Sequence, residues 1–323
     1  MGAARVAVRG GGRAIALALA LALTACAGPQ TSRLLTSASD LPLRAEVGGV
    51  PYYAQEDFYC GPAALAMVAT WAGGAPLTQA EAAALVYTPH KQGSFREDMV
   101  AAARRAGLRA VPVRDLRSLL DELAAGHPVL VFQNLGLDWV PAWHYSVAIG
   151  YERDRRALQL RSGPFERLVT DMSVFEHTWR RGDYWALVVL PPGRLPAKTN
   201  ERDVLEAALG LERAGNAEAA ALAYASATQR WPESHGAWFA LGNARYDAGD
   251  FAGAAVSFER ATMLKPDDPD AWNNLAYALV EAGRPGEARQ AAERAVRLAP
   301  AGAEEPYRAT LQEIHLLTAR VAG

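Results

Sequence analysis

Residues in the C-terminal part of the chain recur with a period of 34. Six pairs share this interval: Trp238 and Trp272, Leu241 and Leu275, Gly249 and Gly283, Ala254 and Ala288, Ala261 and Ala295, and Pro266 and Pro300. Units of this length cannot each bury a core, so they are stable only when neighbours stack into an elongated array. An Ala-rich helical bundle without a period would not place six pairs in register. We therefore predict a stack of helical units here.

The small residues and prolines at these positions resemble the tetratricopeptide repeat. An earlier and weaker copy has the same phase at Gly215, Ala220, Ala227 and Pro232. We expect about three repeats over residues 200–323, closed by a capping helix over about 304–319. The resemblance implies an all-α solenoid with a groove for an extended peptide or a helix of a protein partner, which the sequence does not name.

The N-terminus has the composition of a secretory signal. Arg5, Arg9 and Arg13 precede a ten-residue apolar run over 14–23, which is too short to span a bilayer. The run ends in Leu-Thr-Ala-Cys and resembles a lipobox, which implies cleavage after residue 25 and lipidation of Cys26. The alternatives are an ordinary signal peptide cut near Ala27 and a retained anchor. The expected location is the cell envelope, at the periplasmic face of the outer membrane.

Composition divides the remaining chain. Residues 26–40 are polar, with Pro and Ser, and are expected to form a tether. Residues 41–193 mix short β-type runs with helical ones, up to a boundary at Pro191-Pro192-Gly193. Within them we expect helices over 61–71, 95–106 and 116–125, and strands over 108–113, 128–133, 142–150, 157–161 and 185–190.

Cysteine usage singles out one thiol. The chain has two cysteines, and if Cys26 carries lipid, Cys60 has no partner for a disulfide. Gly61-Pro62 and the apolar run that follows predict a helix that begins at Cys60. Free N–H groups and the helix dipole at that end favour a thiolate, the nucleophilic form of cysteine. A small buried hydrophobe is the alternative interpretation.

An activated thiolate needs a base, and His144 is the best candidate. It lies in a β-type run in which alternation places His144 and Ser146 on the same face. Gln55, just before the nucleophile, can offer its amide to the oxyanion of a tetrahedral intermediate, with the Cys60 N–H as second donor. The alternatives are a structural histidine and an exposed loop glutamine.

Gln55 to Leu65, with Trp143-His144-Tyr145, resembles the papain-like peptidases that remove double-glycine leaders from bacteriocin precursors, and especially their lipoprotein relatives fused to tetratricopeptide repeats. The resemblance implies an α+β papain-like cysteine peptidase domain, a thiolate–imidazolium pair and a thioester acyl-enzyme.

Two features depart from that family. Gln55 lies five residues before Cys60, where the family usually has six. The strand after the histidine usually carries Asp or Asn, whereas here it leads to Ser162. Serine can fix the imidazole tautomer but cannot stabilise imidazolium as a carboxylate does. Asp154 and Asp171 are alternatives that their spacing does not favour.

These observations predict an envelope-anchored cysteine peptidase whose repeats recruit a protein substrate or partner. A non-catalytic scaffold with a degenerate peptidase domain is the second hypothesis, and another thiol-dependent acyl transfer is the third. The formal charge of −2, without a basic cluster, gives no support for a nucleic-acid partner. No His/Cys/Asp cluster has metal-ligand spacing, so neither a metal nor a cofactor is expected.

Overall fold

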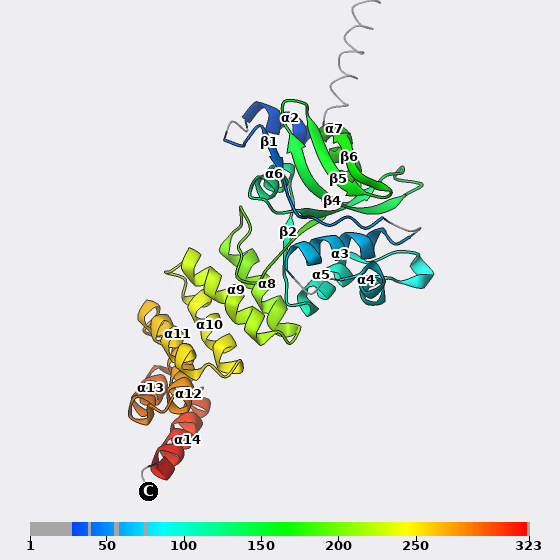
Figure 1. Ribbon diagram of the computed structural model, residues 1–323. Coiled ribbons are helices and arrows are strands. Elements are labelled where there is room, and N and C mark those ends of the chain that lie inside the picture. Colours follow the sequence, from blue (N-terminus) through cyan, green and yellow to red (C-terminus); the bar gives the residue numbers. More distant parts are fainter. Residues whose placement is uncertain (1–27, 38–39, 55–57, 74–76, 322–323) are drawn as a thin grey trace, which may run out of the picture.

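The computed structural model describes residues 28–37, 40–54, 58–73 and 77–321 of the chain. An α/β region is followed by a run of helices (Figure 1), as predicted for a peptidase-like domain and a repeat solenoid. The predicted signal peptide over 1–25, Cys26 and Gln55 lie outside the described residues. None of the helices within the described ranges combines the length and the apolar character needed to cross a membrane.

A seven-stranded antiparallel sheet is the framework of the α/β region. Its strands are β1 (Arg44–Glu46), β2 (Arg109–Val113), β3 (Val129–Asn134), β4 (Trp143–Glu152), β5 (Ala157–Ser162), β6 (Phe165–Asp171) and β7 (Ala186–Leu190). The order is β2-β7-β3-β4-β5-β6, and β1 pairs with β4. Strands β3, β4 and β7 are buried over most of their lengths, because helices cover both faces. The sequence therefore shows apolar runs there instead of strict alternation.

Helices α3 (Cys60–Trp71), α4 (Gln79–Val86) and α5 (Arg96–Arg105) lie together beside the sheet (Figure 1). Every residue from Gly61 to Ala69 in α3 is buried. This helix packs against β4, β3 and β7 as well as its neighbouring helices. Because little of its surface reaches solvent, its sequence shows no polar face. A helix that is held on all sides gives its first residue, Cys60, a fixed position.

Two further helices, α6 (Leu116–Ala124) and α7 (Met172–Arg180), complete the region together with a 3-10 turn over Pro89–Lys91. The observed elements agree with the predicted ones to within one or two residues wherever a helix or strand was predicted. Elements β1, β6, α4 and α7 were not predicted. Strand β6 lies at the edge of the sheet and has no fully buried residue, so its sequence lacks the apolar run of a buried strand.

The stretch expected to be a tether differs from that prediction. Residues 29–37 form helix α2 (Pro29–Ser37), which packs on α6 and α7. Glu176 of α7 is almost fully buried, and its carboxylate accepts hydrogen bonds from Gln30 N (2.9 Å), Thr31 N (2.7 Å) and Thr31 Oγ1 (2.7 Å). A carboxylate at the N-terminus of a helix satisfies its free N–H groups. Of the polar side chains that suggested a tether, Thr31 contributes its hydroxyl to this contact.

Seven helices form the C-terminal part. They are α8 (Glu201–Arg213), α9 (Ala217–Arg230), α10 (His235–Asp247), α11 (Phe251–Leu264), α12 (Pro269–Glu281), α13 (Pro285–Leu298) and α14 (Glu305–Val321). Consecutive helices pack as antiparallel neighbours, giving three pairs and a final helix, as the period of 34 predicts. The first turn of each pair contains a glycine with positive φ, namely Gly215 (81°), Gly249 (79°) and Gly283 (74°). Glycine recurs at these three positions because residues with a side chain disfavour this left-handed conformation.

Candidate active site

Cys60 is the first residue of α3, as predicted. The chain enters the helix through Phe58, whose φ of 68° lies in the left-handed region that a phenylalanine rarely adopts. The N-cap residue, Tyr59, makes no capping hydrogen bond through its side chain. N–H groups of the first turn therefore remain available to a negatively charged atom.

Gly61 lets two other segments approach the nucleophile closely. A Cβ atom at this position would lie 2.5 Å from Ser94 Oγ and 3.4 Å from the ring of Tyr145. The Tyr145 hydroxyl in turn donates to Ser94 O at 3.1 Å. The turn before α5 and strand β4 are thus both held against the start of α3. A larger residue after Cys60 would force them apart.

The environment of the thiol is more apolar than the sequence suggested. Burial raises the pKa of Cys60, while the N–H groups of Tyr145, of Gly61 and of Cys60 itself act in the opposite direction. We expected the helix N-terminus to lower this pKa, but the loss of hydration outweighs the N–H groups. The influence of the Tyr145 N–H also locates the sulfur against the backbone of β4, one residue from His144.

His144 is the second residue of β4 and lies opposite Gln133 of β3. Its Nε2 atom is 2.8 Å from Ser162 Oγ, at the end of β5. This contact engages Nε2, and Nδ1 has no hydrogen-bond partner among the described residues. Burial lowers the pKa of His144 to about 4, so the imidazole is neutral near pH 7.

A buried chain of hydrogen bonds fixes β4 beside His144. Ser146 Oγ donates to Gln133 Oε1 at 2.8 Å, and Gln133 Nε2 donates to Thr178 Oγ1 at 2.7 Å. These bonds join β4, β3 and α7. Because Ser146 lies two residues from His144 on the same face, they also restrict where the imidazole can go.

The alternative carboxylates have other partners. Asp154 accepts a hydrogen bond from Arg44 Nη2 at 2.8 Å, and this bond holds the pKa of Asp154 below its usual value. Asp171 caps α7 by accepting from the N–H groups of Ser173 and Val174. Ser162 is therefore the predicted orienting residue that the structure brings to His144. Gln55 lies outside the described residues, so its part in the site stays a prediction.

An exposed apolar loop beside His144 was missing from the sequence-based site. Residues 135–142 join β3 to β4 and expose Leu135, Leu137, Trp139 and Val140, with Trp139 79% exposed. Asn134 holds the loop by accepting from Gly136 N and Ala142 N. Exposed apolar patches of this kind are typical of binding surfaces. The sequence signal for this surface was the group of four apolar residues between β3 and His144.

The described ranges contain no group of three or more His, Cys, Asp or Glu residues arranged to hold a metal ion. The acid–base groups assembled around α3 and β4 are a thiol, an imidazole and a hydroxyl. Such a set is suited to acyl transfer through a covalent intermediate.

Comparison with known families agrees with this architecture. Residues 47–183 match the family described as Peptidase C39 like family. Residues 205–263 and 239–303 match the tetratricopeptide repeat. No curated protein matches the chain.

The solved structures similar to this chain include three that cover a little over a third of it. The Yersinia enterocolitica type III secretion chaperone SycD, in complex with a peptide of the translocator YopD, is 18% identical, with a TM-score of 0.34 over 36% of this chain and 92% of that one. The first tetratricopeptide repeat domain of Spaghetti (RPAP3), bound to an HSP90 peptide, is also 18% identical, with a TM-score of 0.34 over 38% and 94%. An alternative dimer of the Yersinia chaperone is 20% identical, with a TM-score of 0.33 over 36% and 92%.

The family matches cover the segments in which sequence and structure place the catalytic candidates and the helical array. The chain thus consists of a peptidase C39-like domain, matched over residues 47–183, followed by tetratricopeptide repeats, matched over residues 205–303.

Proposed function

We propose that the C39-like domain is a cysteine peptidase with Cys60 as nucleophile and His144 as base. The observation that carries the proposal is the 2.8 Å contact between His144 Nε2 and Ser162 Oγ. It fixes the ring and leaves Nδ1 for the thiol. The sulfur against the Tyr145 backbone and the free first-turn N–H groups of α3 support the same assignment.

The resting pair is neutral, because burial disfavours both the thiolate and the imidazolium. In the proposed reaction, His144 takes the thiol proton as the sulfur bonds to the peptide carbonyl carbon. The imidazolium then gives that proton to the departing amine, and the C–N bond breaks to leave a thioester. Water, deprotonated by His144, hydrolyses the thioester and restores the thiol. The N–H groups at the start of α3 stabilise the oxyanion, and Gln55 is their proposed partner.

We further propose that Cys26 carries the lipid and that the domain stands at the periplasmic face of the outer membrane. The docking of α2 bears on this arrangement, because Gly28 lies only two residues after Cys26. A lipid at Cys26 would then hold the peptidase domain close to the bilayer instead of on a long tether. The repeats would recruit a protein substrate or partner.

A non-catalytic scaffold is the second candidate, and one observation favours it. Ser162 supplies no negative charge to stabilise an imidazolium, in a site whose burial already opposes charge. The peptidase and the scaffold predict different effects on peptide hydrolysis when a carboxylate replaces Ser162.

The Ser162→Asp variant tests the proposal. A carboxylate beside the imidazole is expected to raise the pKa of His144 from about 4 by roughly 1–3 units and to speed peptide hydrolysis at least about tenfold. NMR titration of the ring and release of new peptide N-termini are the two measurements. Ser162→Asn, which can bond to the ring without a charge, is the control. A raised pKa with hydrolysis still at background would contradict the peptidase assignment and favour the scaffold.

A further inference from the structure

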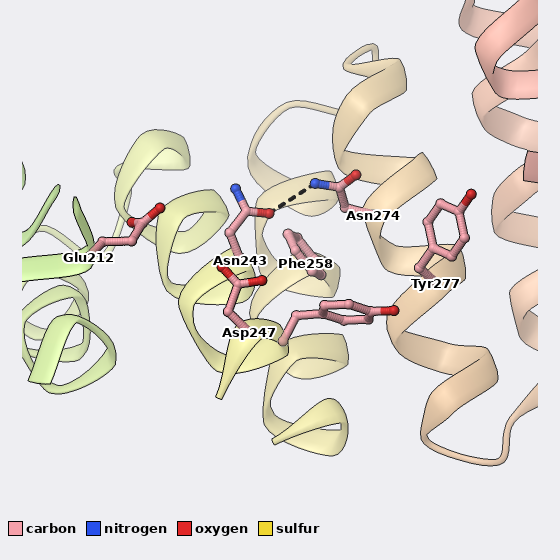
Figure 2. A pocket seen from close by; sticks show the side chains of 7 residues that line it. Glu212, Asn243, Asp247, Phe258, Asn274 and Tyr277 are labelled. Atoms are coloured by element: carbon pink, nitrogen blue, oxygen red, sulfur yellow. Dashed lines mark hydrogen bonds between the residues drawn. The ribbon is translucent and has the colours of Figure 1, made fainter. Parts of the chain in front are cut away.

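The helices of the repeats enclose a hollow of about 410 Å³, lined by Glu212 of α8, Asn243, Tyr246 and Asp247 of α10, Phe258 of α11, and Asn274 and Tyr277 of α12 (Figure 2). A second hollow of about 620 Å³ shares Glu212 and Asn243 with the first, so the two are adjacent. We call them together the repeat groove. Its length over several helices suits an extended segment better than a compact small molecule.

Two asparagines in the repeat groove form an incomplete amide pair. Asn274 Nδ2 donates to Asn243 Oδ1 at 2.9 Å (Figure 2). Asn243 Nδ2 has no partner among the described residues, and Asn274 Oδ1 receives only a long contact of 3.5 Å from Asn273 Nδ2. An unused donor thus lies next to a weakly used acceptor. Together they match the C=O and N–H groups that an extended peptide backbone presents.

Carboxylates give the repeat groove a negative charge. Glu212 accepts a hydrogen bond from Tyr224 OH at 3.0 Å, which orients it, and Asp247 lines the same hollow. Neither forms an ion pair with a cation in the described part of the chain. The one basic residue lining the groove, Arg202, is already paired with Glu206 at 3.0 Å.

The acidic character continues toward the last helices. Burial is the main reason that the pKa of Tyr246 is raised, and the negative charges of Glu281, Glu313 and Asp247 raise it further. Glu313 is held by a 2.9 Å hydrogen bond from Tyr277 OH. A ligand that enters the groove therefore meets oriented negative charge on several helices, which favours a cation and disfavours an anion.

We propose that the repeat groove binds an extended segment of a protein partner that carries lysine or arginine. Its backbone pairs with Asn243 and Asn274, and its cationic side chains lie between Glu212 and Asp247, with Glu313 beside Tyr277 next to the groove. Aromatic groups of Tyr246 and Tyr277 pack against the aliphatic parts of these side chains. This binding does not depend on the proposed peptidase activity.

The test is fluorescence anisotropy with two labelled peptides that differ only in charge, one alternating Lys with Leu and the other alternating Glu with Leu. The receptor is the full chain carrying Cys60→Ala, so that hydrolysis cannot interfere. At physiological ionic strength the lysine peptide is expected to bind, more weakly as salt rises, and the glutamate peptide at least about tenfold more weakly.

Variants locate the binding. Glu212→Gln combined with Asp247→Asn is expected to weaken binding of the lysine peptide by at least about tenfold. Asn274→Ala should weaken it by a smaller factor and leave the salt dependence unchanged. Glu218→Gln, the same change on an exposed residue of α9 outside the groove, should have no effect. No binding of the lysine peptide, equal binding of the two peptides, or equal loss in the control and the double variant would overturn the proposal.

Discussion

The Cys60→Ser variant is expected to hydrolyse peptides at least about a thousandfold more slowly than the wild type. A serine hydroxyl has a far higher pKa than a thiol, and burial already raises the pKa of Cys60. His144, with its pKa lowered to about 4, is too weak a base to compensate. The measurement is the release of new N-termini from a peptide substrate.

The substitution changes one atom in a half-buried side chain, so the unfolding temperature is expected to stay within a few degrees of the wild-type value. Thr70→Ser, which keeps a hydroxyl near the other end of α3, is the matched control and should retain full hydrolysis. Hydrolysis by Cys60→Ser at the wild-type rate would show that another group carries the reaction.

The second large effect concerns Arg109, which joins the two domains. Its side chain starts at β2 and is fully buried, with Nη2 within hydrogen-bond distance of Pro192 O (2.6 Å), Ala223 O (2.8 Å) and Ser226 Oγ (2.7 Å). The last two belong to α9. No described carboxylate pairs with this guanidinium, and burial lowers its pKa to about 10. Packing and hydrogen bonds therefore hold it in place instead of an ion pair.

Arg109→Ala is expected to lower the free energy of unfolding by about 3 kcal/mol, because it removes the hydrogen bonds that Nη2 donates and leaves a cavity between β2 and α9. Thermal unfolding measures the loss. Limited proteolysis should also show faster cutting between residues 191 and 200.

Arg114→Ala provides the control, since Arg114 also bridges the domains. Its contact with Asp203 of α8 is 3.1 Å long, but the Arg114 side chain is 64% exposed. A surface pair of this kind contributes about 0–1 kcal/mol. Equal losses in the two variants would mean that Arg109 has no special part in joining the domains.

The sequence predicted the elements whose signals are local or periodic. Gly215, Gly249 and Gly283 mark the turns of the repeats because their backbone conformation requires glycine. Gly61-Pro62 marks the start of α3 in the same way. The contact of Ser162 with His144 could be expected because the two residues lie on adjacent strands, although serine departs from the family pattern.

Features that depend on distant contacts were not predictable. Helix α2 is stabilised by Glu176, which lies 145 residues away from Thr31 in the sequence. The raised pKa of Cys60 depends on how completely β4 and the turn at Ser94 cover the thiol. The helix N-terminus, which favours the thiolate, can be predicted from the residues next to Cys60. The burial that disfavours the thiolate cannot, because it depends on distant segments.

The proposed reaction requires transfer of the Cys60 proton to His144, and the rate at which iodoacetamide alkylates Cys60 near neutral pH tests this directly. Mass spectrometry of the peptide that contains Cys60 gives the rate for wild type, for His144→Ala, and for His90→Ala, which changes an exposed histidine. We predict that His144→Ala slows alkylation at least about tenfold and that His90→Ala leaves it unchanged, because His144 is the proposed acceptor of the Cys60 proton. Equal rates in all three proteins would contradict the Cys60–His144 pair.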